Sequence, residues 1–190
     1  RSRGLGDVYK RQELIVVGVL CVLFAFLYTT GPYPLSYNGW GDVLVIVFFG
    51  FVPVGGTYYV QALTWTPDVT IASLICGLLI DTLLVVNNYR DREADARSGK
   101  RTVIVRFGEK FGRYFYLMLG VTASLLCLCF LREGHFLAAL LPQLYLIPHF
   151  LTWKRMVKIY SGKKLNSILG ETSRNMLFMG VLIAIGMLVS

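Results

Sequence analysis

The sequence predicts an all-α protein, built as a polytopic bundle of six transmembrane helices. Hydrophobic side chains make up 55% of its 190 residues, and the mean hydropathy of +0.60 is well above that of a soluble domain. The apolar residues gather in runs that are apolar on every face, and most runs are long enough to cross a bilayer. The six runs are Leu14–Thr30, Val43–Leu63, Val69–Val86, Tyr114–Leu131, Phe136–Trp153 and Met176–Val189.

The first twelve residues differ in character from these runs. They are polar and basic, begin without methionine and lack the organisation of a signal peptide. Their sequence, R-S-R-G-L-G-D-V-Y-K-R-Q, resembles a translated adapter tail. We therefore expect residues 1–12 to be foreign to the native fold, and one membrane domain to cover residues 13–190.

Glycine and proline shape the first two runs. The first run ends at G-P-Y-P, residues 31–34, which does not continue as a helix. Asp42 stands just before the second run, where its side chain could cap the helix N-terminus. Within the second run, Pro53 and the pair Gly55-Gly56 predict a kink or the close approach of a neighbouring helix.

The third run leads directly into the densest block of charge in the chain, Asn87 to Arg106. Asn87, Asp91 and Asp95 are spaced i, i+4 and i+8, which places them along one stripe of a helix. Two carboxylates one turn apart, with an amide one turn below, can hold Mg²⁺ and leave its other positions to water and phosphate oxygens. We therefore predict that Asp91 and Asp95 bind Mg²⁺ and are the catalytic residues.

Basic residues surround these acids and could bind an oligophosphate once a metal is in place. They are Arg90, Arg92, Arg97, Lys100 and Arg101. The residues to which we assign substrate binding are Asn87, Asn88, Arg90, Lys100 and Arg101. The competing interpretation is a solvated basic loop between two spans, in which the acids are incidental.

Three other kinds of residue inside the runs could have a functional role. Asp81 is the one acid within a run, and it could either line a watery cavity or hydrogen-bond to another helix. His149, beside Pro148, is predicted to be a core histidine with its hydrogen bonds satisfied. The cysteines show no metal-ligand spacing, so we expect small core residues and no disulfide framework. They are Cys21, Cys76, Cys127 and Cys129.

The distribution of positive charge predicts the orientation in the membrane. The net charge of +8 could suggest nucleic acid as a partner, but the charges lie in the links between spans. After the third run, seven Lys and Arg lie between Arg90 and Lys110, and after the fifth, five lie between Lys154 and Lys164, which places both links on the cytoplasmic side. The four Lys and Arg of residues 1–12 would then face outward, against the rule, which fits a foreign tail.

Several motifs resemble one family of membrane enzymes. The run N-N-x-R-D-x-x-x-D-x-x-x-G-K-R-T-x-x-V-R-x-G is similar to the second Asp-rich motif of the UbiA superfamily of prenyltransferases. The segments Y-T-x-G-P, F-F-G-x-x-x-x-G-G-T-Y-Y-V-Q and L-N-x-x-L-G-x-T-S-R resemble the branch that acts on 1,4-dihydroxy-2-naphthoate. The resemblance extends over nearly all of Leu14 to Ser190.

This resemblance implies a fold, a reaction and a cofactor. Family enzymes have nine helices and an Asp-rich motif on the second and sixth, so the six runs correspond to helices 4 to 9. The implied reaction is Mg²⁺-dependent transfer from polyprenyl diphosphate to 1,4-dihydroxy-2-naphthoate in the bacterial inner membrane. Carbon dioxide and diphosphate leave, and the product is demethylmenaquinol. Because the first Asp-rich motif is absent, we expect the chain alone to be inactive.

Two alternatives remain open at this point. A related prenyltransferase could act on another aromatic acid, such as 4-hydroxybenzoate. A fragment of a membrane transporter would also explain six spans and Asp81, but that class favours inverted repeats and broken helices. We find no internal repeat, and a transporter gives no reason for N-N-Y-R-D-R-E-A-D.

Overall fold

A computed structural model describes the backbone of residues 3–189 and the side chains of residues 12–189. As predicted, this part of the chain is all-α, with no strand between residues 3 and 189. The longer helices are α1 (Arg3–Thr29), α4 (Pro67–Arg97), α5 (Val103–Leu126), α7 (Leu146–Ile159) and α8 (Asn166–Val189). The shorter ones are α2 (Gly41–Val45), α3 (Gly56–Ala62) and α6 (Phe136–Leu140).

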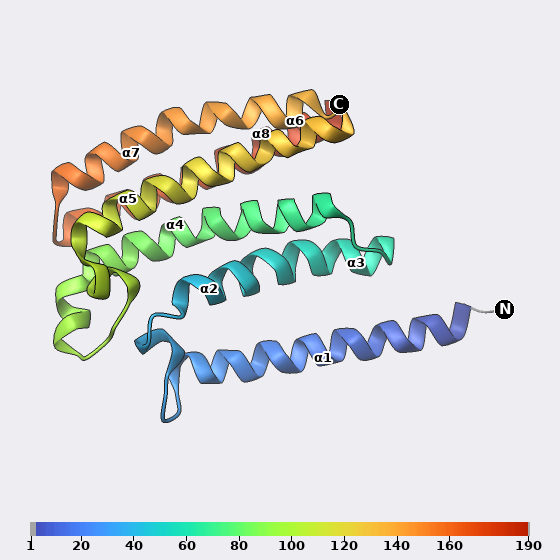
Figure 1. The fold of residues 1–190 in the computed structure, drawn as a ribbon, viewed down its shortest axis with the longest axis horizontal. Coiled ribbons are helices and arrows are strands. Elements are labelled where there is room, and N and C mark those ends of the chain that lie inside the picture. The colour runs from blue at the N-terminus through green and yellow to red at the C-terminus, as the bar shows by residue number, and fades with distance from the viewer. Residues whose placement is uncertain (1–2, 190) are drawn as a thin grey trace.

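Six helical segments of the described chain are long and apolar enough to cross a membrane, which confirms the predicted number. Several are composite, because short 3-10 or π-helical pieces join the α-helices end to end. The segments are Gln12–Thr29, Gly41–Ala62, Pro67–Arg97, Val103–Glu133, Phe136–Ile159 and Lys163–Val189. Figure 1 shows them lying roughly side by side, with α4 between the α2–α3 segment and α5.

Three helix ends lie well outside the predicted runs. The third helix continues past Val86 to Arg97, and α8 begins at Asn166 rather than Met176. Helix α5 begins at Val103 rather than Tyr114, but Gly108, with a φ of 84°, kinks it into a short first part and the span. Hydropathy detects only the part of a helix that lies in hydrocarbon, whereas charged residues extend a helix readily into water. The side chain of Thr102 accepts a hydrogen bond from the Val105 amide and so caps the early start of α5.

The second span departs from a regular α-helix where the sequence predicts a distortion. Residues Ile46–Gly55 form a π-helical stretch that contains Pro53. Because proline has no backbone N–H, a wider turn accommodates it without a break in the span. The prediction that Asp42 caps this helix was wrong: Trp40 is the capping residue, and Asp42 is buried one position inside α2.

One close approach between helices joins this span to α4. Gly50 lies so near to α4 that an added Cβ would overlap the Ser73 carbonyl and stand 2.8 Å from Gly77 Cα. A Cβ on Gly77 would in turn stand 2.9 Å from Ile46 Cα. The two glycines therefore allow backbone contact between helices, as small residues do in membrane bundles.

Asp81 lies further along the same helix interface. Its side chain is fully buried, and within residues 12–189 neither carboxylate oxygen has a hydrogen-bond partner. The Asp42 carboxyl of α2 is near enough to act on it electrostatically. The structure thus places Asp81 between two helices, with the Asp42 carboxyl of α2 as its polar neighbour.

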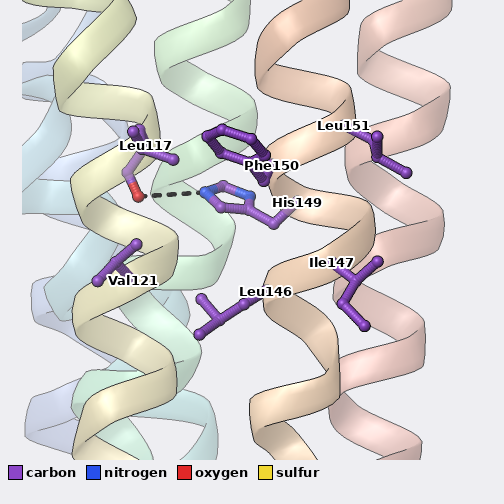
Figure 2. A pocket seen from close by; sticks show the side chains of 7 residues that line it. All are labelled: Leu117, Val121, Leu146, Ile147, His149, Phe150 and Leu151. Atoms are coloured by element: carbon purple, nitrogen blue, oxygen red, sulfur yellow. Dashed lines mark hydrogen bonds between the residues drawn. The ribbon is translucent and has the colours of Figure 1, made fainter.

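The core histidine is as predicted. His149 on α7 is fully buried; its Nε2 donates to the Leu117 carbonyl of α5 at 3.2 Å, and its Nδ1 accepts from the Tyr145 hydroxyl at 2.9 Å. Figure 2 shows the ring between the two helices beside a cavity of about 440 Å³ with an almost wholly apolar lining. Both ring nitrogens are occupied, so His149 has no spare atom for catalysis. The four cysteines are free, but of the four predicted core residues only Cys127 is buried, while Cys21, Cys76 and Cys129 are half-buried.

Helix α1 forms the edge of the fold in Figure 1. Its apolar side chains from Gln12 onward are mostly exposed, which suits a helix that faces lipid. Contacts with the second span include Phe24 against Phe48 and a hydrogen bond from the Tyr59 hydroxyl to Glu13. The helix begins at Arg3, ahead of the predicted tail boundary. That residues 1–12 are foreign stays a prediction, since the side chains of residues 1–11 lie outside the described part.

Candidate functional site

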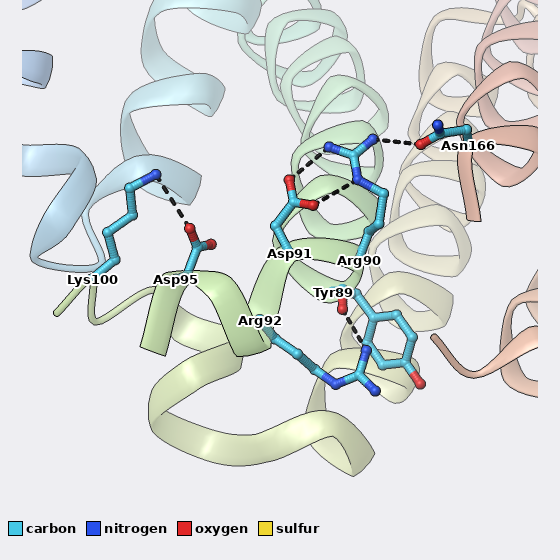
Figure 3. Close-up of polar contacts among 7 residues, drawn as sticks. All are labelled: Tyr89, Arg90, Asp91, Arg92, Asp95, Lys100 and Asn166. Atoms are coloured by element: carbon cyan, nitrogen blue, oxygen red, sulfur yellow. Dashed lines mark hydrogen bonds and ion pairs between the residues drawn. The ribbon is translucent and has the colours of Figure 1, made fainter. Parts of the chain in front are cut away.

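The predicted acids lie on the last turns of α4, where this helix extends beyond its apolar part. Asn87, Asp91 and Asp95 are therefore helical, and their spacing puts them along one stripe as expected. The side chain of Asp91 is 45% exposed and that of Asp95 is 10% exposed. Figure 3 shows both carboxyls at one end of the bundle, each next to a basic side chain.

Asp91 is paired with the residue before it. Arg90 Nε donates to Asp91 Oδ1 at 2.8 Å, and Arg90 Nη2 donates to Oδ2 at 2.6 Å, so both carboxylate oxygens are engaged. The third nitrogen, Nη1, donates to the side-chain oxygen of Asn166 at 2.8 Å. Asn166 is the first residue of α8 and was not among the predicted site residues. Arg90 thereby joins α4 to α8 beside Asp91.

Asp95 is paired with Lys100, which follows the end of α4. The Lys100 ammonium lies 3.3 Å from Asp95 Oδ1, and the Lys100 amide donates to the Asp95 carbonyl at 2.9 Å. The same ammonium lies 5.3 Å from the centre of the Tyr37 ring. Lys100 therefore stands at the site, as predicted, and brings the link after α1 close to it.

The side chains of the other residues predicted to bind substrate make no hydrogen bonds within residues 12–189. Asn87 and Asn88 are half-buried, and neither side-chain amide makes a hydrogen bond within residues 12–189. Arg101 has an exposed side chain, while its backbone N–H donates to the Tyr37 carbonyl at 2.7 Å. Asn87 and Asn88 precede Asp91 by about one turn of α4, and Arg101 follows Lys100 in the chain, so all three have side chains free to bind a ligand.

The link between α1 and α2 is fastened to the link between α4 and α5 at further points. Arg106 Nη2 donates to the Asn38 carbonyl at 2.7 Å. Gly39 has a φ of 80° and lies so close that an added Cβ would stand 2.9 Å from the Arg101 carbonyl. Residues 37–39 therefore form one wall of the site, which the sequence motifs alone did not indicate.

Arg92 does not belong to this site, although the sequence suggested it as a phosphate donor. Its side chain is buried on another face of α4, where Nη1 donates to the Tyr89 carbonyl at 2.6 Å. The guanidinium lies over the rings of Tyr89 and Tyr160, at 4.5 and 5.0 Å from their centres. Because neighbouring residues on a helix are about 100° apart, Arg92 points away from Asp91.

Tyr160 fastens the end of α7 to α4 and α5. The Arg113 guanidinium lies 5.2 Å from its ring, so two cations flank the tyrosine. The nearby Glu109 carboxylate raises the pKa of the Tyr160 phenol above its ordinary value. Tyr160 also has a φ of 66°, an unfavourable conformation for a residue other than glycine. These contacts hold the short link that leads to Asn166.

We expect Tyr160→Ala to loosen this link. Loss of two cation–π contacts removes the anchor, and amide hydrogen exchange over residues 160–166 should quicken about fivefold. Tyr33→Ala serves as the control, because Tyr33 is exposed and has no ring contact within residues 12–189. Equal exchange rates in the Tyr160 variant and the unchanged protein would contradict the anchoring role.

The donor set suits a divalent cation that takes part of its coordination from a ligand. Among residues 12–189, no three His, Cys, Asp or Glu side chains form a group that could hold a metal. Asp91 and Asp95 supply carboxylate oxygens one turn apart, which is typical of Mg²⁺ sites completed by water and phosphate. The basic residues Arg90, Lys100 and Arg101 surround them.

A largely apolar groove runs between α4 and α8. Its volume is about 620 Å³, and it includes Cys76 and Ile80 of α4. Cys76, Ile80, Asn87 and Asp91 follow one another by four, seven and four residues, so the groove lies along the part of α4 that leads to Asp91. From α8 the groove is lined by Ser173, Met176, Leu177, Gly180, Val181, Ile183 and Ala184.

Comparison with known proteins agrees with this geometry. Residues 6–188 match the UbiA prenyltransferase family. The chain is 34% identical over 189 residues to a 1,4-dihydroxy-2-naphthoate octaprenyltransferase of Haemophilus influenzae, covering 97% of this chain and 59% of that protein. It is 40% identical over 114 residues to the Escherichia coli protein of the same name, covering 60% of this chain and 37% of that protein.

A more distant relative comes from a eukaryote. The UbiA prenyltransferase domain-containing protein 1 of Dictyostelium discoideum is 28% identical over 179 residues, which are 94% of this chain and 53% of that protein. The chain thus spans little more than half the length of the relatives that it matches from end to end. No solved structure matches it.

Proposed function

Because this chain belongs to the UbiA prenyltransferase family, we propose that it forms the larger part of an enzyme that prenylates 1,4-dihydroxy-2-naphthoate. The donor is a polyprenyl diphosphate, the leaving groups are diphosphate and carbon dioxide, and the product is demethylmenaquinol. Two observations support the acceptor: the names of the bacterial relatives, and their match over up to 97% of the chain. The pairing of Asp91 and Asp95 at the end of a membrane helix is the observation that carries the chemistry.

The residues of the site suit an ionising diphosphate. Asp91 and Asp95 would hold Mg²⁺, which when bound neutralises charge on the departing diphosphate. Lys100 and Arg101 would bind phosphate oxygens, and the side-chain amides of Asn87 and Asn88 are free to join them. The prenyl chain would extend from there toward the apolar groove between α4 and α8, which begins at Ile80, eleven residues before Asp91 on α4.

The groove and the charge distribution support the remaining proposals. A polyprenyl tail needs a long apolar surface, and the α4–α8 groove offers one on the same stripe of α4 as Asp91. We place the protein in the bacterial inner membrane with the site at the cytoplasmic face, because most of the basic residues lie between Arg90 and Lys110 and between Lys154 and Lys164. One metal ion held by an Asp pair neutralises only part of the charge of a diphosphate. We therefore expect further metal ligands from the rest of the enzyme, and no transfer by this chain alone.

The test is an acceptor assay on a chimera in which this chain replaces the matching part of the Haemophilus influenzae relative. In lipid with Mg²⁺ and a polyprenyl diphosphate, we expect it to prenylate 1,4-dihydroxy-2-naphthoate and to release labelled carbon dioxide from the carboxylate. The isolated 190-residue chain is the comparison and should show no transfer. A preference for 4-hydroxybenzoate would reassign the acceptor, and equal rates from chain and chimera would refute the need for further ligands.

A further inference from the structure

Asp91 differs from Asp95 in how completely a basic residue covers it. Arg90 occupies both Asp91 oxygens, at 2.8 and 2.6 Å, whereas Lys100 approaches one oxygen of Asp95 at 3.3 Å. A metal ion bound by Asp91 needs at least one of these oxygens. In the arrangement seen here, the guanidinium therefore stands where the metal would bind.

The covering contact depends on a residue from another helix. Side chains of neighbouring helical residues normally diverge, so Arg90 must fold back along α4 to reach Asp91. Asn166 of α8 accepts a hydrogen bond from the remaining guanidinium nitrogen at 2.8 Å and fixes this conformation (Figure 3). Asn166 is neutral, so it can hold Arg90 without offering the metal a competing carboxylate.

The ion pair between Arg90 and Asp91 is strong enough to weaken metal binding, but weak enough for a metal–diphosphate complex to displace it. The Asp91 side chain is 45% exposed and that of Arg90 is 25% exposed, so solvent screens the pair. A bidentate pair at such a site typically changes a binding constant by about threefold to tenfold. A divalent cation that carries a diphosphate binds strongly enough to overcome this difference, because the displaced guanidinium can then bind the nearby phosphate oxygens.

We propose that Arg90 and Asn166 form a displaceable cover over Asp91, which weakens metal binding until a diphosphate arrives with the metal. Asn166 is thus a positioning residue, which acts through Arg90, and Arg90 changes partner from carboxylate to phosphate. The proposal rests on the metal site of the proposed function. It adds that the site discriminates against free divalent cations and favours the metal–diphosphate complex.

Mn²⁺ binding to the chimera with the Haemophilus influenzae relative, in lipid nanodiscs, tests the cover, with free Mn²⁺ measured by electron paramagnetic resonance. We expect Arg90→Gln to raise the affinity for Mn²⁺ about threefold to tenfold and to lower the affinity for inorganic diphosphate in the presence of Mn²⁺. Arg174→Gln is the matched control. It removes the same charge from an exposed position on α8 and should change Mn²⁺ affinity less than about twofold.

Asn166 is tested by a double-mutant cycle. Asn166→Ala should raise Mn²⁺ affinity about twofold to threefold when Arg90 is present, and should have no effect in the Arg90→Gln background. An equal effect in both backgrounds would assign Asn166 a role of its own and overturn its part in the cover.

Asp91→Asn separates failure of the cover from failure of the metal site. If this variant binds Mn²⁺ as the unchanged chimera does, Asp91 is not a ligand, and the proposed metal site is refuted together with its cover. If Asp91→Asn weakens binding but Arg90→Gln behaves like Arg174→Gln, the metal site stands and the cover is refuted.

Discussion

Asp91→Ala is expected to lower kcat/KM of the chimera by at least about a hundredfold, the scale on which loss of a group that stabilises transition-state charge acts. The carboxyl would hold the metal that draws charge from the leaving diphosphate, so loss of its oxygens should slow ionisation itself. The decrease should therefore appear in kcat as well as in kcat/KM. The measurement is steady-state transfer to 1,4-dihydroxy-2-naphthoate in lipid at saturating Mg²⁺.

Glu93→Ala is the matched control for this prediction. Glu93 is an exposed acid on the same helix, between the two aspartates in sequence, but it lines a different cavity beside Tyr160. Its removal changes the net charge by the same amount and should leave kcat within about threefold. Near-normal turnover of Asp91→Ala, or an equal loss in both variants, would refute the assignment of Asp91.

The largest effect on stability is expected from Gly50→Val. The new side chain would have to occupy space already filled by the Ser73 carbonyl and Gly77 Cα, which are backbone atoms of a long helix. Neither helix can yield locally without loss of the other contacts between them, so we expect a loss of about 3 kcal/mol or more in the free energy of unfolding. Unfolding by denaturing detergent, followed by circular dichroism, measures it.

Gly180→Ala provides the comparison for this substitution. Gly180 also lies within a membrane helix, but no atom lies within 4 Å of an added Cβ. Alanine at such a position should be neutral or stabilising by about 0.5 kcal/mol, because it restricts the unfolded chain. A small loss in Gly50→Val, similar to that of Gly180→Ala, would show that the two helices are not in backbone contact.

The predictions from sequence succeeded where one helix alone decides the result. Six apolar runs and a four-residue spacing of acids are properties of single helices, and the structure has both. Helical geometry does not separate Arg90 from Arg92, because both are direct neighbours of Asp91 on α4. The rings of Tyr89 and Tyr160 hold Arg92 on another face of the helix, and Tyr160 is distant in the sequence.

Contacts between distant residues were beyond sequence reasoning. Asn166 reaches Arg90 across 76 positions of the chain, and the segment L-N-x-x-L-G contains it without indicating its partner. Asp42 was assigned to the start of its helix from local position, but packing against α4 turned it toward Asp81 instead. Packing against a second helix decides where such side chains point and what they contact. A single sequence does not specify which helices meet.

The fastening of residues 37–39 to the link after α4 has a consequence for the order of assembly. Asn38 is held by Arg106, a residue made 68 positions later, and the Tyr37 carbonyl is held by the Arg101 amide. During synthesis the first two spans therefore enter the membrane before the partners of their connecting link exist. The wall of the site closes only after the third span has been inserted and the start of the fourth has emerged from the ribosome. The wall of the site can therefore fold only after residues 1–106, slightly more than half of this chain, have been synthesised.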